Sequence, residues 1–364
     1  MPTEITITPA EAPALILDVL RTTRVPMICS SPGLGKSSII QQVAKEQNLK
    51  VIDLRLAQCD PTDLSGFPFV DKEAGKASYM PMDTFPIEGD SLPRRKDEDG
   101  NDLPVKMNAD NQDENEYAGW LLFLDEFTSA PMSVQAAAYK IVLDHQVGQH
   151  NLHKRVKMVC AGNLASDRAI VNRLSTAMQS RLIHFEMVND VKGWLDWANL
   201  NDIDFRVTSY INFKNERLHD FSPDHADKTF PCPRTWEFVS DIIKPWKSLP
   251  VEKTPIIAGT VGEGVALEFT SFCAIYDKLP SFQEILANPT GVLIPTQPDV
   301  CYAISGLIGA NANISNIEKI IPAVLKMDIE FQIISLNGAI KKNPKIMQLP
   351  GIRTWITDNA KDMV

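Results

Sequence analysis

Residues 29–39 read C-S-S-P-G-L-G-K-S-S-I and carry most of a phosphate-binding loop. The pattern of such loops is G-x-x-x-x-G-K-[ST], and Gly35, Lys36 and Ser37 match its second half. The position of the first glycine is occupied by Ser30. Taken alone, the departure leaves three interpretations open: a chance match, a disabled nucleotide site, or a working site with a varied entry.

The chemistry of a phosphate loop depends on backbone N–H groups at a helix N-terminus, where the helix dipole also favours negative charge. Gly33 and Gly35 permit the positive φ angles that bring the backbone close to phosphate, and Pro32 stiffens the turn. Lys36 would reach the β and γ phosphates, and Ser37 would bind Mg²⁺. The residues expected to contact nucleotide are Ser31, Pro32, Gly33, Leu34, Gly35, Lys36, Ser37 and Ser38.

Polar side chains follow two later apolar segments. The segment LLFLDE ends in Asp125 and Glu126, about ninety residues after the loop. An aspartate there would hold Mg²⁺, and the next glutamate would orient and deprotonate the attacking water. Asn163 follows the apolar segment VKMVCAG, where an amide can point into the ligand crevice of a parallel sheet and align the water. A turn-forming role for Asn163 after Gly162 stays open.

Two arginines also stand where they can assist phosphate chemistry. Arg181 comes just before an apolar strand pattern in MQSRLIHFEM. Arg234 lies at the start of a helical pattern in PCPRTWEFV, after two prolines that fix the entry of the helix. Arg168 and Arg173 lie close upstream of Arg181, so the choice among these three remains open.

The elements that must position these residues alternate between strand and helix patterns in the first half of the chain. The loop follows one expected strand and opens one expected helix, which is the arrangement a phosphate loop requires. Such alternation predicts a mostly parallel α/β sheet flanked by helices. The expected elements are helix 8–21, strand 25–31, helix 36–47, strand 51–58, strand 119–126, helix 131–144, a small hairpin within 147–155 and strand 156–162.

An insertion at about residues 60–118 interrupts this alternation. We expect Asp60 to Leu64 to begin a helix that an inserted loop or hairpin then breaks. Residues 88–118 carry ten acidic and four basic residues, a net charge of −6. Because residues 89–116 contain few large apolar side chains, we expect them to form a solvated, mobile surface segment.

The second half of the chain is helical in pattern from Val191 onward. We expect a core at residues 1–188, a helical lid at 189–250 that carries Arg234, and a C-terminal helical region at 251–364 that packs on the lid or continues it. The boundary between core and lid should fall between Met187 and Val191. The tryptophans of the lid are expected in its apolar core: Trp194, Trp197 and Trp236.

Composition limits the class of protein. The 364 residues carry a formal net charge of −10, which argues against broad electrostatic binding of nucleic acid. No apolar run approaches the ~20 residues that span a bilayer, and the acidic N-terminus lacks a secretory pattern. Six scattered cysteines fit reduced, mostly buried thiols, and the three histidines between 145 and 153 lack the spacing of a metal site on a helix. We expect a cytoplasmic protein.

The order of these motifs resembles that of the AAA+ ATPases, in particular the MoxR-type branch with an insert in the second helix. The resemblance runs over nearly the full length. The stretches that carry it are SSPGLGKSS, VIDLRLAQCDPTDLSGFP, LLFLDEFTSAP, SVQAAAYKIVLDHQVG, VCAGN, AMQSRLIHFEM, CPRTWEFVS and GTVGEGVALEF. It departs from the pattern at Ser30, which changes no charged group.

The resemblance implies a function and a role for each residue. The chain would hydrolyse ATP with Mg²⁺ in a homo-oligomeric ring, usually of six subunits, and would remodel or mature a protein complex with a partner that bears a von Willebrand A domain. Lys36 and Ser37 would bind phosphate and Mg²⁺, and Asp125 would hold the metal. The catalytic set would be Glu126 as base, Asn163 as first sensor, Arg181 as the finger inserted into the neighbouring subunit, and Arg234 as the lid sensor.

Two other functions remain open on the sequence. A nucleic-acid motor or loader could use the same core, although the charge of −10 and the absence of a recognisable DNA-binding module count against it. A scaffold that binds ATP with negligible hydrolysis is the other alternative, and the intact Glu126 and Asn163 disfavour it.

Overall fold

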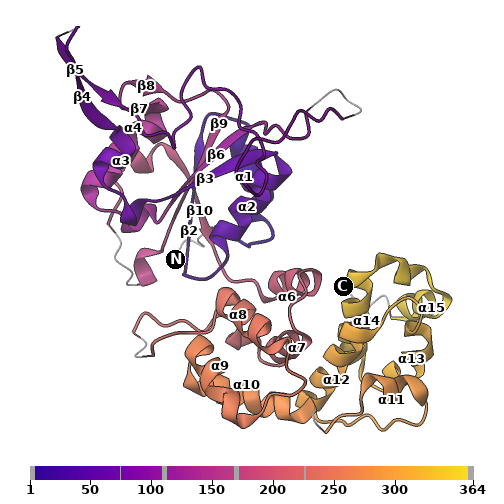
Figure 1. Cartoon of the computed structure of the whole chain (residues 1–364). Coiled ribbons are helices and arrows are strands. Elements are labelled where there is room, and N and C mark those ends of the chain that lie inside the picture. Colours follow the sequence, from indigo (N-terminus) through magenta and orange to yellow (C-terminus); the bar gives the residue numbers. More distant parts are fainter. Residues whose placement is uncertain are drawn as a thin grey trace. The chain divides into compact units, whose positions relative to one another are not determined.

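The computed structural model describes residues 5–73, 75–108, 113–167, 172–224, 227–276 and 278–359. The chain divides into two compact units between Asn189 and Asp190. Figure 1 shows an α/β unit that contains the phosphate-loop segment and a second unit built from helices. Each unit is described by itself below.

The first unit is built on a six-stranded sheet whose neighbouring strands are all parallel, in the order β1-β10-β2-β9-β6-β3. This confirms the predicted fold class, a P-loop-type α/β core with a parallel sheet flanked by helices and followed by a helical region. The strands are β1 (Thr6–Ile7), β2 (Val25–Ser30), β3 (Leu49–Arg55), β6 (Gly119–Asp125), β9 (Val156–Gly162) and β10 (Leu182–Met187).

One face of the sheet is covered by α1 (Ala12–Leu20) and α2 (Lys36–Glu46). The regular helix α1 begins at Ala12, and Thr8 and Glu11 form the expected capping pair before it: the Thr8 N–H donates to Glu11 Oε2 at 2.8 Å, and the Glu11 N–H donates to Thr8 Oγ1 at 3.3 Å. The apolar side chains of this layer are buried, as both faces of a parallel sheet require. They include Ile16, Ile28, Ile40, Val43, Leu121, Phe123 and Val159.

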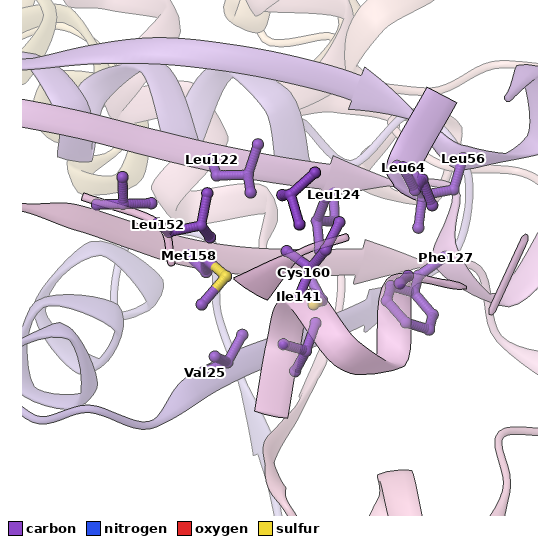
Figure 2. Packing of buried hydrophobic residues seen from close by; sticks show 14 of the residues in the cluster. Val25, Leu56, Leu64, Leu122, Leu124, Phe127, Ile141, Leu152, Met158 and Cys160 are labelled. Carbon is purple, nitrogen blue, oxygen red and sulfur yellow. The ribbon is translucent and has the colours of Figure 1, made fainter. Parts of the chain in front are cut away.

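The opposite face packs against α3 (Pro61–Ser65) and α4 (Met132–Asp144), and Figure 2 shows this apolar layer from close by. β3 ends at Arg55, earlier than predicted, because Leu56 turns into this layer from a 3₁₀ turn (Leu56–Gln58) and is fully buried there. Other side chains of the layer are Val25, Leu64, Leu122, Leu124, Phe127, Ile141, Leu152, Met158 and Cys160.

The region predicted as an insertion contains a hairpin and an irregular segment. After α3, the strands β4 (Phe67–Asp71) and β5 (Lys76–Met80) form an antiparallel hairpin that projects from the unit in Figure 1. The described part of 88–118 follows an irregular path held by isolated bridges, such as Arg94 with Glu116, and by an Arg94–Asp113 ion pair at 2.7 Å. A second hairpin, β7 (Gln146–Val147) and β8 (His150–Asn151), precedes β9, and α5 (Thr176–Gln179) precedes β10.

The second unit is helical throughout its described part. Its helices enclose two apolar cores: α6 to α10 surround Trp236 and Phe269, and α11 to α15 surround Ile304 and Trp355. The predicted division of this unit at residue 250 stays a prediction. The helices are α6 (Val191–Leu200), α7 (Phe205–Phe213), α8 (Pro233–Ile243), α9 (Thr254–Val261), α10 (Glu263–Tyr276), α11 (Phe282–Ala287), α12 (Pro298–Asn311), α13 (Ile317–Val324), α14 (Ile329–Lys342) and α15 (Pro350–Asp358).

Tryptophan burial in this unit corrects one expectation. Trp236 is fully buried and Trp194 is buried, but Trp197 is 36% exposed because it lies away from the core face of α6. In the part of the chain that the structure describes, no helix is both long and apolar enough to span a membrane.

Candidate nucleotide-binding site

The phosphate loop connects β2 to α2, as the sequence predicted. Gly33 (φ 81°) and Gly35 (φ 87°) both adopt positive φ, which only glycine reaches readily. Gly35 is the N-cap of α2, and a Cβ placed on it meets no atom within 4 Å. The space beside the helix N-terminus is therefore open, and the backbone geometry suits an anion.

Lys36 donates to two oxygens of Ser30 in this loop and to the side chain of Asn163 after β9. Its Nζ donates to Ser30 Oγ at 2.9 Å, to the Ser30 carbonyl at 3.1 Å and to Asn163 Oδ1 at 3.3 Å. Ser30 is fully buried, and its hydroxyl donates to the Ser31 carbonyl at 3.0 Å. The residue that replaces the consensus glycine thus forms a direct contact with the loop lysine.

The two acids follow β6 as predicted, but they differ in conformation. Asp125 is the last residue of β6, and Glu126 leaves the strand with φ 55°, an uncommon value for a residue other than glycine. The Glu126 N–H donates to Asp125 Oδ1 at 2.8 Å. This bond supports the turn that begins at Glu126.

A third acid, Asp53, lies on the neighbouring strand. The register pairs Asp53 with Phe123 and Arg55 with Asp125, so Asp53, Arg55 and Asp125 share one face of the sheet. Burial raises the pKa of Asp53 above its usual value, the charge of Asp125 raises it further, and Arg55 opposes both. The alternation in VIDLRL could have placed Asp53 on this face, but nothing in it indicated the pairing with β6.

Asn163 is bound to the turn that follows Glu126. Thr128 Oγ1 accepts from the Asn163 N–H at 3.0 Å and donates to the Asn163 carbonyl at 3.2 Å. Thr128 is 6% exposed, and a Cβ on Gly162 would lie 2.6 Å from Thr128 Oγ1. We call this pairing of Thr128 with Asn163 the Thr128 latch. It joins the segment after β6 to the segment after β9.

The same turn is held from two other directions. The Asn172 N–H donates to the Thr128 carbonyl at 2.6 Å, and Asn172 Nδ2 donates to the Ala130 carbonyl at 2.8 Å. Gln135, which is buried in α4, donates to the Phe127 and Ala130 carbonyls at 3.3 and 3.2 Å. Sequence reasoning missed Thr128, Asn172 and Gln135, because each acts through a backbone group that no motif marks.

These contacts place the predicted groups at one edge of the sheet. β2, β6 and β9 run parallel, and the loop, the two acids and Asn163 follow their carboxyl ends. In open α/β sheets, ligands bind in the crevice outside these ends. The sequence prediction that these segments converge therefore agrees with the geometry, while their catalytic roles stay proposals.

The arginines do not join this group within the first unit. Arg181 precedes β10, at the amino-terminal edge of the sheet, and donates to the Tyr139 hydroxyl and the Ala177 carbonyl, both at 3.0 Å. Arg173 is exposed, and Arg168 lies outside the described residues. Arg234 is exposed in the first turn of α8. This helix belongs to the second unit, whereas the phosphate loop belongs to the first.

The residues present fit ATP with Mg²⁺. The open helix N-terminus suits phosphate, and the Lys36 ammonium is held by neutral oxygens that phosphate oxygens can replace. Among the described residues, no cluster of three or more His, Cys, Asp or Glu side chains could hold a metal alone. Asp125 supplies one carboxylate at this edge of the sheet, and Mg²⁺ binds in proteins through one or two carboxylates plus substrate phosphates.

No protein-family model matches the chain, and no curated protein matches its sequence. Solved structures resemble it at low identity. A putative ATPase from Cytophaga hutchinsonii is 12% identical, with 93% of this chain and 79% of that chain covered and a TM-score of 0.34. NtrX from Brucella abortus in complex with ATP is also 12% identical, with 99% of this chain and 70% of that chain covered and a TM-score of 0.37. A mutant of Thermotoga maritima RuvB is 14% identical, with 88% of each chain covered and a TM-score of 0.40. With TM-scores this low, the fold assignment rests on the strand order and register given above.

Proposed function

We propose that this chain is an ATP hydrolase of the AAA+ class. The observation that carries the proposal is the 3.3 Å contact between Lys36 Nζ and Asn163 Oδ1. It brings the loop after β2 and the amide after β9 together at the sheet edge where Asp125 and Glu126 also end their strand. A lysine, an amide and two carboxylates at one crevice are the groups that phosphoryl transfer to water requires.

The division of labour follows from these positions. Bound ATP with Mg²⁺ supplies the phosphoryl group and a metal charge that offsets its negative charge. With ATP bound, Lys36 would exchange its bonds to Ser30 and Asn163 for bonds to phosphate oxygens, and Ser37 with Asp125 would hold the metal. Glu126 takes the proton of the attacking water, and Asn163, fixed by the Thr128 latch, orients that water.

The finer function rests on the resemblance of motifs rather than on geometry. We propose a MoxR-type protein that works as a hexameric ring in the cytoplasm and remodels or matures a protein complex together with a von Willebrand A domain partner. Its support is the order of SSPGLGKSS, LLFLDEFTSAP, VCAGN and CPRTWEFVS along the chain.

Hydrolysis is tested by phosphate release from Mg·ATP. Glu126→Gln should lower turnover by about 10²–10⁴-fold, the usual contribution of a general base, while ATP binding persists. Glu98→Gln, which removes an exposed acid of the inserted segment, is the matched control and should behave as the wild type. Equal turnover in Glu126→Gln and wild type would instead indicate a scaffold that binds nucleotide without using this base.

The client is tested with the same variant. Glu126→Gln, saturated with ATP, should retain its partner proteins on affinity capture, and a von Willebrand A domain protein should be among them. Capture by the Lys36→Ala variant, which lacks the lysine that would bind ATP phosphates at the loop, is the control and should be weaker. ATPase stimulation by DNA at physiological salt, without stimulation by any captured protein, would favour the nucleic-acid motor.

A further inference from the structure

A cavity of about 600 Å³ lies in the first unit at the amino-terminal edge of the sheet. Its walls come from the connection between α1 and β2, the C-terminal end of α4, the connection between β8 and β9, and Arg181 before β10. Val25, at the start of β2, lines the cavity, whereas Ser30, at the end of β2, belongs to the phosphate loop. At ~3.3 Å per residue, about 17 Å of strand separate the two places, so this is a separate site.

The wall of the cavity is strongly positive. Four cationic side chains line it against one carboxylate, Asp144. Glu88 approaches one of the cations, with its Oε1 3.9 Å from Lys154 Nζ, but both side chains are largely exposed and the pair is weak. The four cations arise from three separate segments of the chain: Arg24, Lys154, Lys157 and Arg181.

The rest of the lining adds an apolar surface and neutral hydrogen-bonding groups. The Tyr139 hydroxyl accepts from Arg181 and so orients one guanidinium at the cavity. His145 is half-buried there, and burial holds its pKa below the ordinary value, so its imidazole is neutral at pH 7. The apolar part of the lining consists of Leu20, Val25, Val142, Leu143, Leu152, Val156 and Met158.

We propose that this cavity binds a phosphorylated organic molecule of nucleotide size. Four cationic side chains against one carboxylate leave a net excess of three positive charges, and the planar guanidinium groups of Arg24 and Arg181 match phosphate oxygens two at a time. The volume falls within the range of small-molecule sites, and the apolar lining provides a surface for the organic part of the ligand. The site goes beyond the proposed ATPase function, because it lies at the opposite edge of the sheet from the phosphate loop; among its lining residues only Arg181 also has a proposed role in hydrolysis, toward the ATP of a neighbouring subunit.

The test uses the full-length Lys36→Ala protein, in which the phosphate loop no longer competes for the ligand. Titration calorimetry with inorganic pyrophosphate and with ATP at low salt should show one saturable site per chain. ATP should bind more tightly than pyrophosphate, because only ATP has an organic part. Removal of one cation, by Lys157→Ala or separately by Arg24→Gln, should weaken binding about tenfold or more, as the loss of a charged hydrogen bond does.

Lys45→Ala removes an exposed positive charge from α2, outside the cavity, and is the matched control. It should leave both affinities unchanged, and melting temperatures should show that every variant is folded. The proposal is overturned if neither probe saturates, if Lys45→Ala weakens binding as much as Lys157→Ala, or if binding occurs only in an oligomeric fraction. Binding only in the oligomeric fraction would mean that the cavity residues contact a ligand held by a neighbouring copy of the chain.

Discussion

Ser30 occupies the place of a glycine in the phosphate-loop pattern, and its hydroxyl contacts the loop lysine at 2.9 Å. The hydroxyl and the Asn163 amide hold the Lys36 ammonium at the position that phosphate would take up. Ser30 is small enough to be fully buried at the end of β2, so the strand and the loop keep their geometry. Of the three interpretations left open by the sequence, a working site with a varied entry agrees best with these contacts.

Substitutions at these two positions should therefore differ sharply. Lys36→Ala should abolish ATP binding at the phosphate loop and leave only the binding proposed for the cavity lined by Arg24 and Lys157, because it removes the one positive charge that the motif supplies to the phosphates. Ser30→Gly should change the dissociation constant only a few-fold, since the Lys36 bonds to the Ser30 carbonyl and to Asn163 remain possible. Fluorescence titration with a labelled ATP analogue measures both. If the two variants lose equal affinity, the loop does not bind phosphate as described.

Asp53 makes the stability of the first unit depend on pH. Its folded-state pKa is raised, by burial first and then by the charge of Asp125. The native state therefore binds more protons than the unfolded state between the unfolded value, ~3.9, and the raised value. The contribution of Asp53 to stability must fall as pH rises through that window, and the penalty is complete above it.

Asp53→Asn should remove this penalty. The melting temperature of the variant, minus that of the wild type, should increase between pH 4 and pH 7, as followed by circular dichroism at about 1-unit steps. Asp83→Asn, an exposed change in the inserted segment, is the control and should give a flat difference. A difference for Asp53→Asn that is also flat would show that Asp53 is not coupled to Asp125.

At the scale of elements, the turn after β6 determines how the site is assembled. Three residues from outside the turn bond to it: Asn163 through its backbone to the Thr128 hydroxyl, and Asn172 and Gln135 through their side chains to backbone carbonyls. The turn therefore joins Asp125 and Glu126 to the segment after β9 and to α4. Movement of any one of these segments must disturb the others.

The Thr128 latch can be tested by removing its hydroxyl. Thr128→Val keeps the shape but leaves the Asn163 N–H and carbonyl without this partner, which should cost about 1–3 kcal/mol of unfolding free energy. Turnover should fall more than ATP affinity, because Asn163 is misplaced while the phosphate loop is intact. Urea denaturation and phosphate release measure the two effects.

Thr128→Ser is the matched control for this prediction. It keeps the hydroxyl and loses only the methyl group that packs near Gly162, so it should retain most of the turnover. Equal losses in Thr128→Val and Thr128→Ser would show that packing, and not the hydrogen bonds to Asn163, sets the effect.

The helices and strands could be predicted well where the pattern of apolar residues and the sequence motifs indicate the same element. Apolar runs such as GWLLFLDE and VKMVCAG gave β6 and β9 to within a residue, because strands buried on both faces are nearly continuous in apolar side chains. The sequence overextended β3 to Gln58, since the apolar Leu56 turns into the core from a 3₁₀ turn instead of continuing the strand. The Lys36 contact with Ser30 and the Thr128 latch could not be predicted, because both depend on tertiary distances between loops.

At the scale of the whole molecule, the two edges of the sheet carry different parts of the proposed machinery. Met187, at the end of β10, pairs with Ser30 beside the phosphate loop, whereas Leu182, at its start, pairs with Val25. Arg181 precedes Leu182, so about 17 Å of strand separate it from the loop of its own chain. The structure thus favours a role for Arg181 toward another molecule over a role in its own site.

Arg181→Ala should then abolish turnover without removing ATP binding, with a loss on the order of 10³–10⁵-fold if it acts as an arginine finger. Specific activity of the wild type should rise with protein concentration, because the site is complete only between subunits. An equimolar mixture of Arg181→Ala with Glu126→Gln should regain activity, since one subunit supplies the arginine and the other the base. Phosphate release measured across a dilution series tests all three statements.

Arg173→Ala is the control, because Arg173 is the other described candidate and is also exposed. If Arg181 is the finger, Arg173→Ala should keep the concentration-dependent activity, and its mixture with Glu126→Gln should show no gain from complementation. If the Arg181→Ala mixture stays inactive while the Arg173→Ala mixture recovers, the finger is Arg173. In that case Arg181, about 17 Å of strand away from the phosphate loop, bonds to Tyr139 and takes no part in hydrolysis.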